Sequence, residues 1–187
     1  MNYISDHYAT SKGLIRSGLS HLESLLGRTR EFERVDLDRV ERLVFVCLGN
    51  ICRSPFGEFI AKNESVPAAG FGLSTSSNRP AFKTAIKTAD KFDIDLSPHL
   101  TTDIQDFEIR ESDLLLVMEV RHARRLKSLL KNSRAQIALL GRWASPRRLH
   151  IHDPFEHDEC YFYHCYSVIN QSTKNLISEW KLCKSRT

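Results

Sequence analysis

Along the chain, short runs of consecutive apolar residues alternate with longer segments in which apolar residues recur every three or four positions. The runs have the length and continuity of strands buried on both faces, and they lie at residues 43–46, 66–70, 112–118 and 135–140. The segments of helical period lie at residues 14–26, 56–62, 80–92, 120–130 and 158–184. Strands that alternate with helices predict an α/β fold, a three-layer sandwich in which helices cover both faces of a four-stranded parallel sheet.

The first 40 residues predict a helical extension ahead of this α/β domain, which we place at residues 41–187. Apolar residues of the extension recur at near-helical spacing; they are Leu14, Ile15, Leu19, Leu22, Leu25 and Leu26. Gly27 is expected to end the helix, and the charge-rich residues 28–42 are typical of a solvated linker. Such a helix either contacts a membrane surface or a partner, or packs on its own domain or on a second copy. The thin basic face favours packing over membrane contact.

The overall composition indicates a globular protein and narrows its location and partners. Of the 187 residues, 41% are hydrophobic and 27% are charged, which excludes an intrinsically disordered chain. No apolar run approaches the ~20 residues that span a bilayer, and the N-terminus lacks the apolar core of a signal peptide. Five cysteines without framework-like spacing fit a reducing compartment, so we expect a cytoplasmic protein. The net charge of +4 does not demand a nucleic-acid partner.

The most informative stretch is residues 43–55, with the sequence LVFVCLGNICRSP. It predicts a buried strand, a tight loop and a helix start, since Ser54 suits an N-cap and Pro55 suits the first helical position. A loop that leads into a helix N-terminus directs backbone N–H groups and the positive end of the helix dipole towards one point, which makes an anion site. This field favours an ionised Cys47 thiol, and Arg53 adds a planar guanidinium that matches two phosphate oxygens. The combination indicates phosphoryl transfer to sulfur.

The string VCLGNICRSP, at residues 46–55, resembles the active-site signature of the low-molecular-weight protein tyrosine phosphatases almost letter for letter. The resemblance covers roughly residues 40–184. It implies a phosphatase that hydrolyses protein phosphotyrosine and small aryl phosphates through a phosphocysteine on Cys47, without a cofactor or a metal ion. It also implies that the loop binds the phosphate, through Leu48, Gly49, Asn50, Ile51, Cys52, Arg53 and Ser54. The partner would be a tyrosine-phosphorylated protein, such as a bacterial tyrosine kinase.

A second element of the chemistry follows the predicted strand at residues 135–140. Sheets of this kind bind ligands at the carboxyl ends of their strands, where Cys47 stands, and Asp153 can reach the same edge. A carboxylic acid there can protonate the leaving phenolate and then deprotonate the water that attacks the phosphocysteine. Asp153 begins an Asp-Pro-Phe sequence that resembles the family's Asp-Pro-Tyr motif, which assigns this role to Asp153. Phe155 lacks the tyrosine hydroxyl, and Glu156 replaces a second aromatic residue of many members.

The resemblance implies supporting roles for further residues. Ser54 would donate a hydrogen bond to the thiolate, Asn50 would brace the loop because Asn tolerates unusual backbone angles, and His99 would hydrogen-bond Asn50. Cys52 corresponds to a thiol that can form a protective disulfide with the nucleophile in the family, and by residue type it is equally a small buried residue. The loop at residues 70–80 lacks the Trp that lines the substrate cleft of many members.

Two other functions use a similar loop. A thiol-dependent arsenate reductase shares it but needs two further cysteines in the middle of the chain, whereas no cysteine occurs between Cys52 and Cys160. A phosphotyrosine-binding module without turnover would need neither Cys47 nor Asp153. The residues present therefore favour the phosphatase.

A metal site is a third alternative, because ligand-type residues are dense between residues 150 and 164. They are His150, His152, Asp153, His157, Asp158, Cys160 and His164. Two histidines on a strand, or a cysteine and a histidine on a helix, could hold one ion together. Their spacing matches no established zinc pattern, which favours the phosphatase over a metal centre.

Overall fold

A parallel sheet of four strands forms the centre of the computed structural model, which describes residues 10–131 and 133–186. The strand order is β2-β1-β3-β4. The strands are β1 (Arg42–Cys47), β2 (Ala68–Gly72), β3 (Asp113–Val117) and β4 (Gln136–Leu139). Each pair of neighbouring strands is parallel, so the predicted sheet is confirmed.

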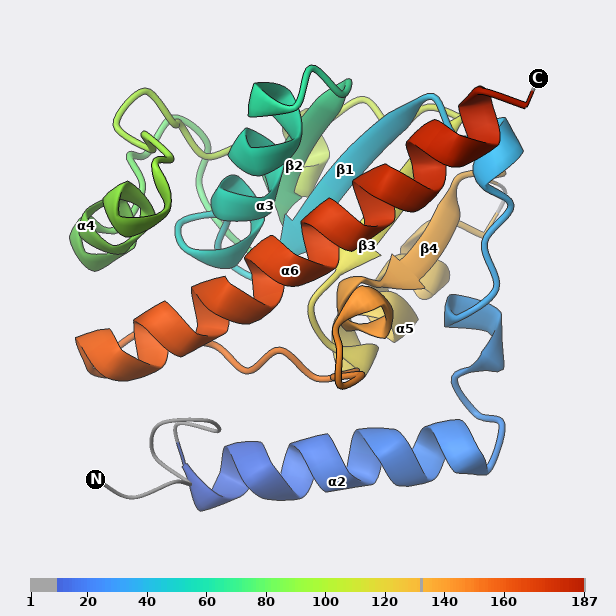
Figure 1. Ribbon diagram of the computed structural model, residues 1–187, viewed down its shortest axis with the longest axis horizontal. Helices are drawn as coiled ribbons and strands as arrows, with labels where there is room; N and C mark the ends of the chain where they lie inside the picture. Colours follow the sequence, from blue (N-terminus) through green and yellow to red (C-terminus); the bar gives the residue numbers. More distant parts are fainter. Residues whose placement is uncertain (1–9, 132, 187) are drawn as a thin grey trace.

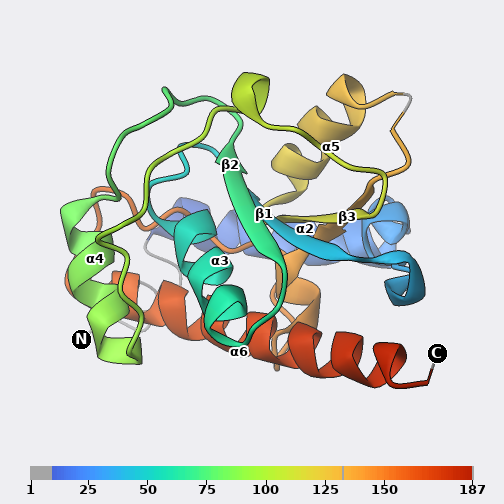
Figure 2. The same ribbon diagram turned by 90° about the horizontal axis from the view of Figure 1, so that it is seen from above.

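Helices cover both faces of this sheet, which confirms the three-layer sandwich (Figures 1 and 2). One face carries α3 (Arg53–Asn63), α4 (Lys83–Ala89) and α6 (Glu159–Lys184), and the other carries α5 (Val120–Leu129). Single 3-10 turns lie at Arg30–Phe32, Leu37–Arg39, Asp90–Phe92, Ile104–Asp106 and Leu140–Trp143. The helix α2 (Ser11–Leu25) lies outside the sandwich, along the lower edge of the view in Figure 1.

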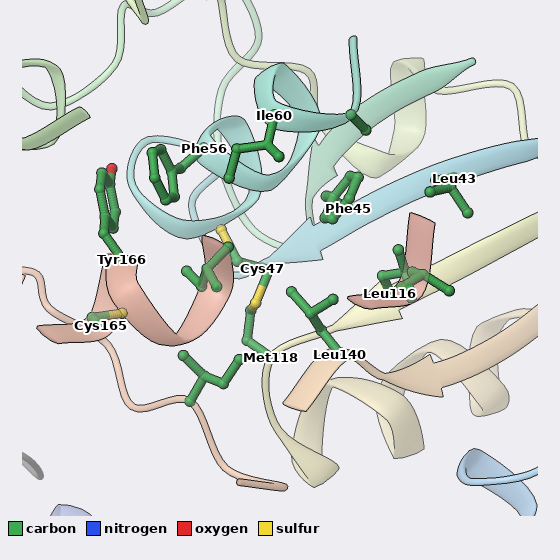
Figure 3. Close-up of a cluster of buried hydrophobic side chains, with 14 of the residues drawn as sticks. Leu43, Phe45, Cys47, Phe56, Ile60, Leu116, Met118, Leu140, Cys165 and Tyr166 are labelled. Carbon is green, nitrogen blue, oxygen red and sulfur yellow. The ribbon is translucent and has the colours of Figure 1, made fainter. Parts of the chain in front are cut away.

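The central strands are buried on both sides because their side chains alternate between two apolar clusters. Phe45 and Leu116 pack with α3 and α6 in the cluster of Figure 3. Val44 and Val46 point to the opposite face and pack in the cluster that contains the inner side of α5. Tyr166 of α6 belongs to the first cluster. A continuous apolar run therefore serves two cores, which is the pattern on which the parallel sheet was predicted.

Two elements are shifted from their predicted positions. The strand expected at residues 66–70 is β2, which continues to Gly72. A Cβ on Gly72 would lie 2.9 Å from the Leu48 carbonyl oxygen, so the strand needs glycine where the loop after β1 crosses it. The helix expected from Pro80 begins at Lys83, because Pro80 is held in an isolated β-bridge.

The segment between α2 and the sheet packs on the α/β unit, so the prediction of a solvated linker is wrong. Phe32, Leu37 and Val40 are buried in the two clusters. The backbone N–H and carbonyl of Asp36 form hydrogen bonds of 2.8 and 2.7 Å with the side chain of Gln136 in the edge strand β4. Most charged residues of this segment face outwards, which is why its composition resembled a linker. The division of the chain at residues 40 and 41 stays a prediction.

The helix α2 contacts its own domain through its small residues. Ser17 and Ser20 are buried, and Gly27 follows the helix with a left-handed φ of 73°, as predicted for its end. The apolar side faces outwards, which reverses the usual orientation of an amphipathic helix. No helix among residues 10–131 and 133–186 is long and apolar enough to cross a membrane.

The close packing of α3 on β1 predicts the effect of one substitution. A Cβ on Gly57 would lie 2.4 Å from Cδ1 of the buried Phe45 ring. We therefore expect Gly57→Ala to lower the free energy of unfolding by about 1–3 kcal/mol through overpacking, in spite of alanine's higher helix propensity. Urea denaturation measures this free energy. Gly18→Ala on α2 is the matched control, since nothing lies within 4 Å of the added Cβ. Equal stability of Gly57→Ala and the parent would contradict the prediction.

Candidate active site

The loop after β1 wraps around the Cys47 sulfur. The backbone N–H of Asn50 donates a hydrogen bond to Sγ at 3.2 Å, and Ser54 Oγ lies 3.0 Å from the same atom. The predicted loop residues Leu48, Gly49 and Ile51 lie in this turn between β1 and α3. Cys47 thus stands at the carboxyl end of a central strand and faces the positive end of the α3 dipole. A thiolate at this position can accept a hydrogen bond from the Asn50 N–H and from the Ser54 hydroxyl.

The side chain of Ser54 serves the loop rather than the helix. The helix α3 begins at Arg53 with Cys52 as its N-cap, so the prediction that Ser54 is the N-cap is wrong. Ser54 lies in the first turn, where its hydroxyl accepts a hydrogen bond of 2.8 Å from Asn50 Nδ2. A hydroxyl that accepts from Asn50 keeps its own proton for the Cys47 sulfur.

Asn50 holds the loop to two neighbouring segments. Its φ of 52° lies in the left-handed region, as expected for this residue. Its side-chain oxygen accepts a hydrogen bond of 2.9 Å from the Thr102 backbone, and its carbonyl oxygen lies 2.7 Å from His99 Nε2. Burial lowers the pKa of His99, so its ring is neutral near pH 7 and Nε2 carries the donated proton. The structure therefore brings Asn50 and His99 together as the resemblance implied.

Arg53 is only 1% exposed, and its guanidinium, which lies beside the loop, joins α3 to two other segments of the chain. Its Nη1 atom donates to Glu119 Oε1 at 2.8 Å and to the Ile151 carbonyl at 2.9 Å, and Nη2 donates to Asp153 Oδ2 at 2.5 Å. Burial by itself would lower the pKa of Arg53, but the carboxylates of Asp153 and Glu119 raise it. The buried side chain therefore stays charged. Its Nε atom has no hydrogen-bond partner among the residues that the structure describes.

Sequence reasoning missed Glu119, which the structure places against Arg53. Burial by itself would raise the pKa of Glu119, but the charge of Arg53, with smaller contributions from His122 and Arg121, holds it well below its usual range. Glu119 is therefore a buried carboxylate that fixes one edge of the guanidinium. It follows β3 directly, so the rule that placed Asp153 at the carboxyl edge of the sheet could also have found Glu119.

Asp153 lies at the rim of the site, where its side chain is 31% exposed. The neighbouring Phe155 is also exposed, and its ring centroid lies 5.0 Å from that of Phe82. Leu48 adds an exposed apolar side chain from the loop, and Glu156 has a left-handed φ of 64°. The rim therefore combines the carboxyl groups of Asp153 and Glu156 with apolar side chains.

Cys52 is a second thiol in the loop, and its surroundings differ from those of Cys47. Burial raises the pKa of Cys52 well above its usual value, so this thiol is protonated near pH 7. The Tyr166 hydroxyl donates a hydrogen bond of 2.9 Å to the Cys52 carbonyl oxygen, which ties α6 to the loop. Both cysteines are free thiols in the structure. The protective disulfide with Cys47 stays a prediction.

The ligand-type residues between residues 150 and 164 do not converge on one point. His150 Nε2 lies 3.3 Å from His152 Nδ1, Cys160 is exposed, and Asp158 caps α6 by accepting a hydrogen bond of 2.8 Å from the Tyr161 backbone. Within the part of the chain that the structure covers, no three His, Cys, Asp or Glu side chains are placed to hold a metal ion.

Comparisons with known proteins agree with this geometry. A family model described as low molecular weight phosphotyrosine protein phosphatase matches residues 42–186. The low molecular weight protein-tyrosine-phosphatase Wzb of Salmonella typhi is 32% identical over 135 residues, 71% of this chain and 89% of that protein. The structure of Vibrio vulnificus Wzb in complex with benzylphosphonate has a TM-score of 0.65 at 26% identity, over 75% of this chain and 99% of that one. YwlE arginine phosphatase from Geobacillus stearothermophilus has a TM-score of 0.67 at 18% identity, over 76% and 94% of the two chains, which shows the fold alone.

Two histidines near Glu119 predict a loss of stability in acid. Burial lowers the pKa of His122 and of His150 from 6.5 to about 4. Between these values the unfolded chain binds protons that the folded chain does not. The stabilisation is therefore complete above pH 6.5 and falls as the pH decreases towards 4, by up to about 1.4 kcal/mol per pH unit for each histidine.

Urea unfolding at a series of pH values through this window tests the prediction. His122→Gln should reduce the dependence of the unfolding free energy on pH, because one of the two imidazoles with a pKa of about 4 is gone. Identical pH dependence in the variant and the parent would contradict it.

Proposed function

Because the chain belongs to the low molecular weight phosphotyrosine protein phosphatase family and is a protein-tyrosine-phosphatase, we propose that it hydrolyses protein phosphotyrosine through a phosphocysteine intermediate on Cys47. The observation that carries this mechanism is the loop around Cys47 Sγ, with the Arg53 guanidinium beside it and in contact with Asp153. These residues supply a nucleophile, an anion clamp and an acid at one edge of the sheet.

The phosphoryl group would bind in the loop above the Cys47 sulfur. Arg53 is held on its Nη1 side by Glu119 and the Ile151 carbonyl, so its Nε and Nη2 atoms form the edge that can meet two phosphate oxygens. The orphaned Nε supports this assignment, because a buried N–H without a partner is costly. The backbone amides of residues 48–54 would bind the remaining oxygens.

Two displacements at phosphorus complete the reaction. In the first, the Cys47 sulfur forms a bond to phosphorus, the bond from phosphorus to the tyrosyl oxygen breaks, and the Asp153 carboxyl group gives its proton to that oxygen. In the second, Asp153 takes a proton from water while the water oxygen bonds to phosphorus and the sulfur–phosphorus bond breaks. Inorganic phosphate leaves, and the thiolate and the protonated Asp153 are restored.

The contact between Arg53 and Asp153 fits this sequence. The bound phosphoryl group takes over the Nη2 atom of Arg53, which releases the Asp153 carboxylate to take up a proton from water at the rim, where the leaving oxygen stands. Glu119 stays in place and keeps the guanidinium oriented. The exposed Phe155 and Leu48 side chains suit the phenyl ring of a phosphotyrosine.

The cellular setting belongs to the same proposal. A nucleophilic thiol must stay reduced, and the five cysteines of the chain are free thiols in the structure, which supports a cytoplasmic location. A tyrosine-phosphorylated protein is the substrate, and a bacterial tyrosine kinase is the partner that we infer from the resemblance.

The arsenate reductase alternative finds less support. The cysteines outside the loop, which are Cys160, Cys165 and Cys183, lie on α6. Burial raises the pKa of Cys165 to about 12, so this thiol is a poor nucleophile for disulfide exchange near neutral pH. Cys165 is therefore poorly suited to a relay of two successive thiol attacks.

Replacement of the nucleophile tests the function directly. We expect the parent to hydrolyse a phosphotyrosine peptide and not a phosphoarginine peptide, the substrate class in the name of its neighbour YwlE. Cys47→Ser should abolish this turnover and retain binding of benzylphosphonate in calorimetry, because the loop and Arg53 are unchanged. Cys160→Ser, which alters an exposed thiol of α6, is the matched control. Appreciable turnover by Cys47→Ser, or preference for phosphoarginine, would contradict the proposal.

Removal of the acid should slow the reaction without abolishing it. Asp153→Ala is expected to lower the turnover of phenyl phosphate by about 10²–10⁴-fold, the contribution of a positioned acid. The loss should be smaller for p-nitrophenyl phosphate, because its leaving group needs less protonation. Glu156→Asn is the control, since it removes a carboxyl group of the same loop with a residue that tolerates the left-handed backbone. Equal losses on both substrates would place the acid elsewhere.

A further inference from the structure

The outer face of α2 is a continuous apolar stripe on the surface of the protein. It consists of Leu14, Ile15, Leu19, Leu22, Leu25 and Leu26, which are between 38 and 82% exposed. The opposite side of the helix, with Ser17 and Ser20, is buried against the domain. The helix therefore keeps its largest apolar side chains in water while its small polar residues are covered, which the folded single chain does not explain.

Gly18 lies within this outer face, one helical turn from both Leu14 and Leu22. Glycine in a helix interior costs about 1 kcal/mol relative to alanine, and nothing lies within 4 Å of the Cβ that an alanine would add. The rest of the chain therefore does not require glycine at this position. A glycine in the middle of an exposed apolar stripe fits the close approach of a second helix backbone.

The charged residues beside the apolar stripe favour a second helix over a membrane surface as the partner of α2. Helices that lie on membranes carry Lys and Arg along the margin of their apolar face. The margin of the outer face has both signs, with Arg16 and Glu23, and Glu23 is already paired with Arg124 of α5 at 2.9 Å. The apolar spacing of Ile15, Leu22 and Leu26 is the spacing that packs helix against helix.

We propose that the outer face of α2 binds the outer face of α2 in a second copy of this chain, with the two helices antiparallel and crossing at Gly18. Gly18 is the midpoint of Ser11–Leu25, so a two-fold axis through the crossing places Leu14 of one copy opposite Leu22 of the other. The stripe is of the order of the ~300–600 Å² of the largest apolar patch on a typical monomer. Two such faces bury about 1,200 Å² at most, the lower limit of stable interfaces, so the dimer is weak and depends on concentration.

Sedimentation velocity of the full chain in reducing buffer, from about 1 to 200 μM, tests the proposal. We expect a shift from monomer to dimer within this range. Leu22→Asp should abolish the shift, and Gly18→Leu should weaken it because a large side chain holds the backbones apart. Leu182→Asp is the matched control and should leave it unchanged, since Leu182 is equally exposed but lies at the end of α6. Unchanged hydrolysis of an aryl phosphate by each variant shows that the α/β unit is intact.

Flotation with vesicles that contain anionic phosphatidylglycerol tests whether the outer face of α2 binds a membrane surface instead of a second copy of the chain. The proposal requires no binding to vesicles, and Gly18→Leu supplies the decisive contrast. An added leucine strengthens insertion into a lipid surface but weakens a close helix crossing. A parent that stays monomeric to the highest concentration, a Gly18→Leu variant that associates more strongly, or vesicle binding by the monomer would overturn the proposal.

Discussion

A cation without access to water must have its charge balanced by the protein, and Arg53 imposes this requirement on two other segments of the chain. Its guanidinium is bound by Glu119 after β3, by the Ile151 carbonyl and by Asp153 ahead of α6. Removing one partner of such a buried pair typically costs about 3–5 kcal/mol. The contacts that orient the Arg53 guanidinium therefore also hold together the segments at the carboxyl edge of the sheet, and the stability of this edge depends on them.

The loop around Cys47 is held by its surroundings as strongly as by its own sequence. Asn50 can keep a left-handed backbone because Thr102 and His99 bind its side chain and carbonyl, and Gly72 leaves room for the crossing of the loop. These contacts come from the end of β2 and from the segment that follows α4 in the sequence. The conformation of the loop thus depends on several segments that meet at the carboxyl edge of the parallel sheet.

The parts of the structure that could be predicted from the sequence are those whose residues lie close together in the chain. Cys47 and Arg53 share one loop, and Asp153 starts a short motif, so each could be found without knowledge of the fold. The contact of Glu119 with Arg53 was not predicted because the two residues lie 66 positions apart in the sequence. A single acidic residue ahead of a helix suggests only a helix start. The orientation of α2 could not be predicted either, since periodicity shows which residues share a face but not which face meets the domain.

The segment between α2 and β1 lies beside β4, which is an edge strand of the sheet. An unprotected edge strand offers free backbone groups to any other extended chain, and proteins commonly shield such edges. At this edge, the backbone of Asp36 forms hydrogen bonds with the Gln136 side chain, and Phe32 is buried in the neighbouring apolar cluster. A chain without the residues ahead of β1 would expose the apolar cluster that Phe32 covers, next to the edge strand β4, and exposed apolar surface beside a strand edge favours aggregation. The residues ahead of the sheet therefore cover apolar surface of the α/β unit beside β4.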